Sequence, residues 1–198
     1  MNEKFFDLKK EKQDRMINAA LRAFGENGYK RASTDEIVAG AGISKGLLFH
    51  YFINKLGLYT FLYEYSVKFL SLELSAFVDK EETNYFELMR QKEKAICQIL
   101  KNYPYMKLFI DRTMSEDVPE ALEATNEQKE AYREMERAIT EQADLSAFSP
   151  NADAEKVMSL VLFAERELMR GNGGEFSPEI FYGEFCGYLN MLEKLCIR

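Results

Sequence analysis

Apolar residues recur every three or four positions along most of the chain, which is the spacing of one face of an α-helix. The first such segment, residues 9–27, carries Met16 and Phe24 on its apolar face, and Gly28 is expected to end it. A longer segment, residues 55–78, continues the same spacing. Because no alternating Val, Ile and Thr run long enough for a convincing strand interrupts this pattern, the sequence predicts an all-α protein.

Helix boundaries are marked by proline, serine and glycine in the second half of the chain. Pro104 and Pro119 each suit the first turn of a helix, where the missing N–H of proline costs nothing. Ser177 suits the cap of the last helix. A glycine-rich stretch, residues 171–174, predicts a turn before that helix.

Two short amphipathic segments joined by Gly42 lie within residues 33–55. Thr34 suits the N-cap of the first segment and Ser44 that of the second. Gly42 supplies the left-handed turn that few other residues tolerate. This arrangement predicts a DNA-binding helix-turn-helix whose second helix enters a major groove. The residues that the pair is expected to bury are Ile37, Val38, Ala41, Ile43, Leu48 and Phe52.

An ordered set of residues extends this pattern over about the first 60 positions. It includes Ile17 and Phe24 in the preceding helix, the run 41–46, Tyr51 and Lys55. In this order and spacing, the set resembles the N-terminal region of the TetR family of transcriptional regulators. The resemblance implies that residues 1–55 form a helix-turn-helix DNA-binding domain and that residues 56–198 form a helical effector-binding and dimerisation domain.

The resemblance also implies partners: double-stranded DNA with a palindromic operator, a small-molecule effector, and a second copy of the chain. The expected function is that of a repressor released from its operator by a small apolar or amphipathic ligand. A two-fold homodimer would present two reading heads. The residues expected to contact DNA are Thr34, Ser44, Lys45, Gly46, Leu47, Phe49, His50, Tyr51 and Lys55.

Two residues of the reading helix depart from the family pattern. Leu47 stands where a small or hydroxylated residue is usual, and Phe49 stands where tyrosine is common. Two hydrogen-bond donors are therefore absent from this face, and apolar contact, for example with a thymine methyl group, is favoured instead.

The charge of the chain differs between its two predicted domains. Residues 1–55 carry 10 Lys and Arg against 7 Asp and Glu, whereas residues 56–198 carry 16 against 26. The first part is therefore basic, and the negative net charge of the whole chain, -7, comes from the second part. A basic head on an acidic body keeps phosphate contacts local and orients the head toward the duplex.

The second domain is rich in Phe, Tyr and Met, for which core packing is the simpler interpretation of any single residue. Collectively they favour an adaptable pocket, and the resemblance implies an inducer cavity in this region. Glu165, Arg166 and Glu167 interrupt an apolar helix, either as a buried polar handle for a ligand or as the polar side of a dimer contact. The expected ligand-binding residues are Phe69, Met89, Phe109, Tyr132, Met135 and Phe163.

The last two helices carry more apolar surface than one face of a bundle needs. In the family the corresponding helices pair with those of a second subunit, so we expect them to form the dimer interface. The residues expected there are Val161, Leu168, Phe185, Tyr188, Leu189 and Leu192.

Cysteine and histidine usage limits the chemistry. The three cysteines are widely spaced and form no Cys-x-x-Cys pair, and His50 is the single histidine. We therefore expect no cofactor, no metal, no catalytic residue and no enzymatic activity. No signal peptide opens the chain and no apolar run approaches the roughly 18 residues of a membrane span. A cytoplasmic protein without a membrane partner is expected.

Two alternatives from other classes stay open. One is a helical dimeric module that binds a ligand or a protein but no specific operator. Leu47 and Phe49 favour this alternative. The other is a helical enzyme with an incidental N-terminal domain, although the sequence holds no nucleophile elbow, phosphate loop or paired metal-ligand motif.

Overall fold

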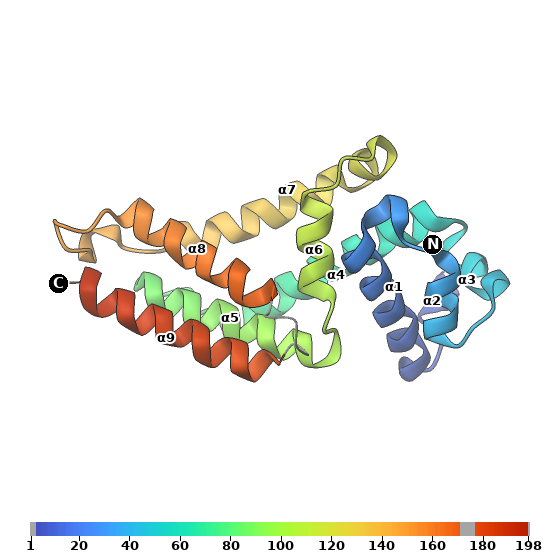
Figure 1. Ribbon diagram of the computed structural model, residues 1–198, viewed down its shortest axis with the longest axis horizontal. Coiled ribbons are helices and arrows are strands. Elements are labelled where there is room, and N and C mark those ends of the chain that lie inside the picture. Colours follow the sequence, from blue (N-terminus) through green and yellow to red (C-terminus); the bar gives the residue numbers. More distant parts are fainter. Residues whose placement is uncertain (1–2, 171–176, 198) are drawn as a thin grey trace. The chain divides into compact units, whose positions relative to one another are not determined.

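The computed structural model describes residues 3–170 and 177–197, and helices account for most of them (Figure 1). Within these residues the β-structure is limited to one isolated bridge between Phe148 and Ile197. The all-α prediction is therefore confirmed. The elements are η1 (Glu3–Phe5), α1 (Lys10–Arg31), α2 (Thr34–Ala41), α3 (Lys45–Phe52), α4 (Lys55–Phe77), α5 (Tyr85–Asn102), α6 (Met106–Met114), α7 (Pro119–Glu141), η2 (Leu145–Ala147), α8 (Ala154–Arg170) and α9 (Pro178–Cys196).

Most helix boundaries follow the signals in the sequence. Pro119 is the first residue of α7, and Ser177 caps α9 by accepting a hydrogen bond from Ile180 N at 3.3 Å. Pro104 precedes α6 by two residues and is not in its first turn. At Gly28 the backbone leaves the helical region, with φ 72° and ψ 173°, as expected, and a further helical turn beyond this kink extends α1 to Arg31. The predicted turn at residues 171–174 lies outside the described residues.

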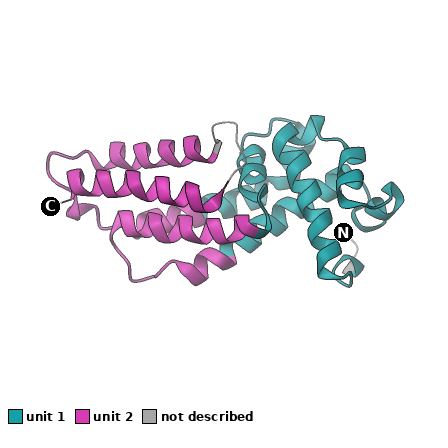
Figure 2. Cartoon of the chain, turned by 60° about the horizontal axis from the view of Figure 1, so that its bottom comes forward, with its two compact units in different colours: residues 1–71, 102–134 teal, residues 72–101, 135–198 magenta. Residues whose placement is uncertain are grey.

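The chain forms two compact units, coloured separately in Figure 2. Unit 1 comprises residues 1–71 and 102–134, and unit 2 comprises residues 72–101 and 135–198. These units do not coincide with the functional division expected at residue 55, because α6 and most of α7 cluster with the N-terminal helices. The division into a DNA-binding and an effector domain stays a prediction about function.

Aromatic side chains fill the core of unit 1. The Phe24 ring of α1 lies 5.0 Å from that of Tyr59 in α4, and the Phe109 ring of α6 lies 5.4 Å from the Tyr59 ring. Tyr59 also donates a hydrogen bond to Thr113 Oγ1 at 2.9 Å. Large aromatic rings bury much apolar area and pack edge to face, so this cluster ties α1, α4 and α6 together.

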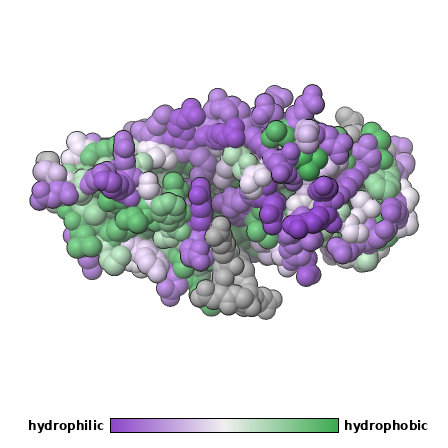
Figure 3. Space-filling model, turned by 45° about the horizontal axis from the view of Figure 1, so that its top comes forward, coloured by the Kyte–Doolittle hydropathy of each residue, from purple (hydrophilic) through white to green (hydrophobic). Residues whose placement is uncertain are grey.

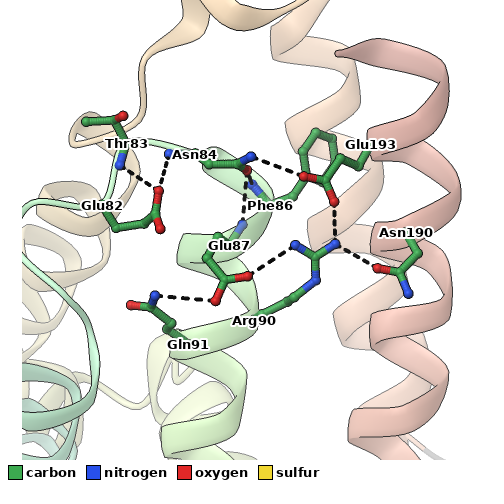
Figure 4. A network of polar contacts seen from close by, with 9 residues as sticks. All are labelled: Glu82, Thr83, Asn84, Phe86, Glu87, Arg90, Gln91, Asn190 and Glu193. Atoms are coloured by element: carbon green, nitrogen blue, oxygen red, sulfur yellow. Dashed lines mark hydrogen bonds and ion pairs between the residues drawn. The ribbon is translucent and has the colours of Figure 1, made fainter. Parts of the chain in front are cut away.

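Polar contacts join α5 and α9 in unit 2 (Figure 4). Arg90 of α5 donates from Nη2 to Asn190 Oδ1, 2.7 Å away, and to Glu193 of α9. Asn84 donates to the same Glu193 carboxylate at 3.1 Å, and its own Oδ1 accepts from the N–H groups of Phe86 and Glu87. Asn84 therefore caps α5 and also links it to α9.

A buried lysine of unit 2 forms ion pairs with carboxylates of two other helices. Lys92 Nζ is 2.9 Å from Glu136 Oε2 and 3.4 Å from Glu165 Oε2. The Glu165 carboxylate is therefore buried and paired with a lysine of the same unit, and the two roles expected of residues 165–167, a buried polar handle for a ligand or the polar side of a dimer contact, stay predictions. Its neighbours Arg166 and Glu167 are exposed.

The outward faces of α8 and α9 expose large apolar residues, and Figure 3 shows hydrophobic side chains gathered on the surface of unit 2. On α9 they follow helical spacing, so they form one stripe. Gly183 and Gly187 lie along this stripe, and a Cβ added at either glycine would have no atom within 4 Å. The exposed apolar residues of the two helices are Leu160, Leu162, Phe163, Ile180, Tyr188, Met191 and Leu195.

Candidate nucleic-acid interface

Helices α2 and α3 are joined by a tight left-handed turn. Gly42 ends α2 with φ 64° and ψ 41°, and its N–H and that of Ile43 return to carbonyls of the helix they leave. Ser44 then caps α3 by accepting a hydrogen bond from Leu47 N at 3.2 Å. The predicted roles of Gly42 and Ser44 in the turn are confirmed, and with Ile37, Ala41, Leu48 and Phe52 all buried the pair forms a helix-turn-helix.

The cap of α2 is one residue earlier than expected. Ser33, in extended conformation, accepts hydrogen bonds from Asp35 N and Glu36 N at 3.2 and 3.4 Å. Thr34 is the first residue of the helix and is half-buried. The prediction that Thr34 caps the helix is therefore wrong. Ser33 and Thr34 are adjacent and both suit an N-cap. Ser33 takes this role because its backbone is extended, whereas Thr34 is already helical.

The exposed side of α3 carries the residues expected to read DNA. Lys45, Gly46 and His50 are exposed, and Leu47 and Phe49 are half-buried. Gly46 faces open space, so a backbone or base edge can approach it closely. The surface therefore combines a cation, an imidazole and two apolar groups, which suits phosphate contact together with contact to thymine methyl groups.

Lys45 has an internal partner. Its Nζ lies 2.9 Å from Asp35 Oδ1 at the start of α2, in an exposed ion pair. Exposed pairs of this kind contribute about 0–1 kcal/mol, so a phosphate can displace the carboxylate at little cost. Asp35 thus holds the lysine within reach of the reading surface.

Tyr51 is buried, not displayed on the reading face. Its ring lies 5.8 Å from that of Phe5 and 5.1 Å from the imidazole of His50. Phe5 belongs to η1 and is itself fully buried against Phe52 and Phe61. The N-terminal turn is therefore a part of the head that the sequence analysis did not assign, although the adjacent pair Phe5-Phe6 among charged residues was its signal.

Lys55 begins α4 and faces the end of α1. Its Nζ donates to Lys30 O at 3.2 Å and lies 5.0 Å from the centre of the Tyr29 ring. Burial lowers the pKa of the Lys55 ammonium, while the carboxylates of Glu120 and Glu116 act in the opposite direction. The side chain is half-buried and keeps part of its surface open to a phosphate.

The turn between α3 and α4 is closed by Asn54 and Gly57. Asn54 Oδ1 accepts a hydrogen bond from Gly57 N at 2.8 Å and so caps α4. A Cβ at Gly57 would lie 2.3 Å from Phe52 O, so only glycine fits there. Ile53 is exposed and has φ 67°, a conformation that β-branched residues rarely adopt.

The head is fastened to α6 and the loop after it by hydrogen bonds to α1. Tyr29 N donates to Glu116 Oε2 at 2.9 Å, and Arg112 donates to the carbonyls of Gly25 and Glu26. Asn18 donates to Asn102 O at 3.0 Å. A displacement of α6 would therefore pull on α1 directly.

The residues expected to bind an effector fall into both units. Phe69, Phe109 and Tyr132 belong to unit 1, where the Phe69 ring stacks on that of Tyr65 and Phe109 joins the aromatic core. Met89, Met135 and Phe163 belong to unit 2; Met89 is buried and Phe163 is 63% exposed. Their role in ligand binding stays a prediction.

The residues expected at the dimer interface divide into inner and outer positions on α8 and α9. Val161, Phe185 and Leu189 are buried inside unit 2, with the Phe185 ring stacked on that of Phe181. Leu168 and Leu192 are half-buried, and Tyr188 is exposed. These three side chains are already covered by their own unit, so they present almost no surface to a second subunit. The amphipathic pattern of α8 and α9 identified the face that packs within the unit.

The described part of the chain thus defines a helical protein with a helix-turn-helix head. None of the helices in that part combines the length and the hydropathy that a bilayer crossing requires. Residues 16–60 match the family described as bacterial regulatory proteins, tetR family. The N-terminal region of the chain is therefore similar to that of TetR-family regulators.

The chain is 27% identical over 95 residues to a fatty acid metabolism regulator protein of Bacillus subtilis (strain 168), a match that spans 48% of this chain and 45% of that relative. Less than half of the relative's length is therefore matched.

Solved structures share the fold over nearly the whole chain. One is the TetR family transcriptional regulator PfmR from Thermus thermophilus, with a TM-score of 0.62, 19% identity, and coverage of 91% of this chain and 97% of that one. Another is AibR in complex with isovaleryl coenzyme A and operator DNA, with a TM-score of 0.61, 16% identity, and coverage of 90% and 97%.

Proposed function

We propose that this chain is a homodimeric transcriptional repressor of the cytoplasm that binds a palindromic operator and releases it when a small apolar or amphipathic effector binds. The observation that carries the proposal is the reading surface of α3, which a Gly42 turn and a Ser44 cap present beside Lys45 and His50. A helix held in this way suits the major groove. The match of residues 16–60 to a family of regulatory proteins supports the same function.

The effector class is supported by two sources. The core of unit 1 contains many large aromatic groups, and such groups favour adaptable apolar sites. The matched relative in Bacillus subtilis is named for fatty acid metabolism, and the AibR structure holds isovaleryl coenzyme A together with operator DNA. An acyl-type ligand is therefore the proposed effector.

The dimer is proposed to form through the outward faces of α8 and α9. Leu160 and Phe163 on α8 and Ile180 and Leu195 on α9 are each at least half exposed, and they leave a large apolar surface for burial against a second copy. The glycines of α9 leave the stripe free of side chains at two positions, so two helices can approach closely there.

Release is proposed to occur through the connection between α6 and α1. Two reading helices can enter successive major grooves only when they lie about one helical turn, roughly 34 Å, apart. A ligand that favours another separation releases DNA, by no more than its own difference in affinity for the two states. The hydrogen bonds from Tyr29 to Glu116 and from Arg112 to α1 provide a route for this coupling.

The test is fluorescence anisotropy of the full chain with short duplexes at a series of salt concentrations. We expect salt-dependent binding, and Lys45→Ala should reduce the salt slope by about 0.9, the value of one phosphate contact in B-DNA. Lys68→Ala, at an exposed lysine of α4 outside the head, is the control and should leave the slope unchanged. Failure of the wild-type chain to bind any duplex would overturn the proposal in favour of a ligand-binding module without an operator.

A further inference from the structure

One lysine of unit 1 is buried without a carboxylate bonded to it. Lys129, on α7, is 1% exposed, and its Nζ has no hydrogen-bond partner among the residues that the structure describes. Two other buried lysines in the described part are paired: Lys92 Nζ lies 2.9 Å from Glu136 Oε2, and Lys107 Nζ lies 2.7 Å from Asp111 Oδ1. Burying an ammonium group without a counter-charge costs free energy, so an anion from outside the chain would stabilise Lys129 in this position.

The neighbouring charges do not supply that anion. Glu116 attracts Lys129, but its carboxylate is already engaged, since Oε2 accepts from Tyr29 N at 2.9 Å and Oε1 accepts from Val118 N at 3.1 Å. Arg133, four residues further along α7, is a second cation and repels Lys129. Burial is the main cause that lowers the pKa of the Lys129 ammonium, and Glu116 offsets only part of it.

A second buried donor in unit 1 also lacks a strong acceptor. The hydroxyl of Tyr63, on α4, donates to Met114 Sδ at 3.2 Å, and a thioether is a weak acceptor. Arg133 is an electrostatic neighbour of Tyr63 as it is of Lys129. The Phe109 ring lies 6.1 Å from the Tyr63 ring, so this donor has an apolar surface beside it.

We propose that Lys129 Nζ binds an anionic oxygen group of the effector, a carboxylate or a phosphate carried on an apolar body, within unit 1. This rests on the proposed function, because it names the chemistry of the ligand that the regulator takes. The pairing satisfies the buried ammonium and relieves its repulsion from Arg133. The aromatic residues of α4 and α6 then serve the apolar part of the ligand.

The test is thermal unfolding of the full-length chain with three probes of equal chain length: dodecanoate, dodecan-1-ol and dodecanoyl coenzyme A. We compare the wild type with Lys129→Met, which keeps the shape and removes the charge, and with Lys68→Met at an exposed lysine of α4. We expect at least one anionic probe to bind the wild type and Lys68→Met at least tenfold more tightly than the alcohol. In Lys129→Met this preference should disappear. If the wild type prefers dodecanoate, the group that Lys129 binds is a carboxylate. If it prefers dodecanoyl coenzyme A alone, that group is a phosphate.

Unliganded stability provides a second readout that does not depend on the probes. Because Lys129 lacks a partner, Lys129→Met should unfold at the same temperature as the wild type or higher, whereas removal of a paired lysine would lower it. A lower unfolding temperature, or failure of the variant to fold, would overturn the proposal. So would equal binding of alcohol and anions by the wild type, or no binding of either anion.

The failure of this proposal is distinguishable from failure of the proposed function. Salt-dependent duplex binding, measured without any probe, tests the regulator alone. A chain that binds duplex but shows no preference for an anion contradicts only the assignment of Lys129. A chain that prefers the anion but binds no duplex contradicts only the regulatory function.

Discussion

Glu116 Oε2 accepts a hydrogen bond from the backbone N–H of Tyr29 at 2.9 Å, which connects the loop after α6 to the end of α1. The same carboxylate accepts from Asp117 N and Val118 N through Oε1, so it also organises the start of α7. The kink at Gly28 is what turns the Tyr29 amide outward, because its φ of 72° breaks the helical hydrogen-bond ladder at this point. One acidic side chain thus joins three segments of unit 1.

Neutralising this side chain should loosen the connection. Glu116→Gln keeps an oxygen acceptor but loses the charge, and hydrogen bonds to charged groups are the stronger ones, so we expect a loss of about 1 kcal/mol in the free energy of unfolding. Urea unfolding measures it. Glu123→Gln, at an exposed position of α7, is the control and should stay within about 0.5 kcal/mol of wild type. Equal stability of both variants would contradict a structural role for Glu116.

Releasing Lys45 from its ion pair should strengthen DNA binding. In Asp35→Asn the lysine loses its carboxylate partner at 2.9 Å and becomes fully available to phosphate. We expect tighter duplex binding at low salt than in wild type. Glu36→Gln removes the same charge from the next residue without freeing Lys45, so it isolates the effect of the pair. If the two variants bind equally well, only net charge matters and the pair has no role.

The turn after α3 should tolerate no side chain at Gly57. Gly57→Ala places a Cβ 2.3 Å from Phe52 O, a contact that only a shift of the backbone can relieve, and we expect a loss of about 1–3 kcal/mol. Gly46→Ala, at a helical glycine of α3 with open space around it, should be neutral or slightly stabilising. Thermal unfolding of the two variants gives the comparison, and similar effects would mean that the turn adapts.

Two leucines of α9 should respond differently to a charge. Leu195 is 71% exposed, so Leu195→Arg should leave the fold intact and shift the protein to monomer in sedimentation. Leu189 is fully buried, so Leu189→Arg should destabilise the fold by several kcal/mol whether or not a dimer forms. A Leu195→Arg variant that stays dimeric at micromolar concentration would move the interface to another surface.

Stability should decline in alkaline solution partly because of Tyr29. Burial raises the pKa of its phenol to about 12, whereas the unfolded chain loses this proton near pH 10. Between these values the unfolded state releases a proton that the native state keeps, so the free energy of unfolding falls as the pH rises. Tyr29→Phe should show a shallower decline in urea midpoints from pH 10 to 12. An identical slope in both proteins would exclude this contribution.

The sequence alone determined the helical fold and the helix-turn-helix, because both depend on local properties of the chain. Gly42 and Ser44 act within a few residues of their positions, and the spacing of Leu48 and Phe52 indicates which side of α3 is buried. The sequence did not identify the N-cap of α2, because Ser33 and Thr34 both have a side chain that can cap a helix and only the backbone conformation distinguishes them.

Only the tertiary structure decided which apolar and charged groups meet. Amphipathic spacing marks Leu189 as buried, but whether its partner is the same chain or a second copy depends on elements distant in sequence. Lys129 stands among many charged residues in α7, so the sequence does not distinguish it from them, and its burial follows from the packing of α7 within unit 1. Glu116 and Tyr29 are 87 residues apart, and no local pattern relates them. Contacts of this range arise from the fold as a whole, which is why the sequence pattern gave no sign of them.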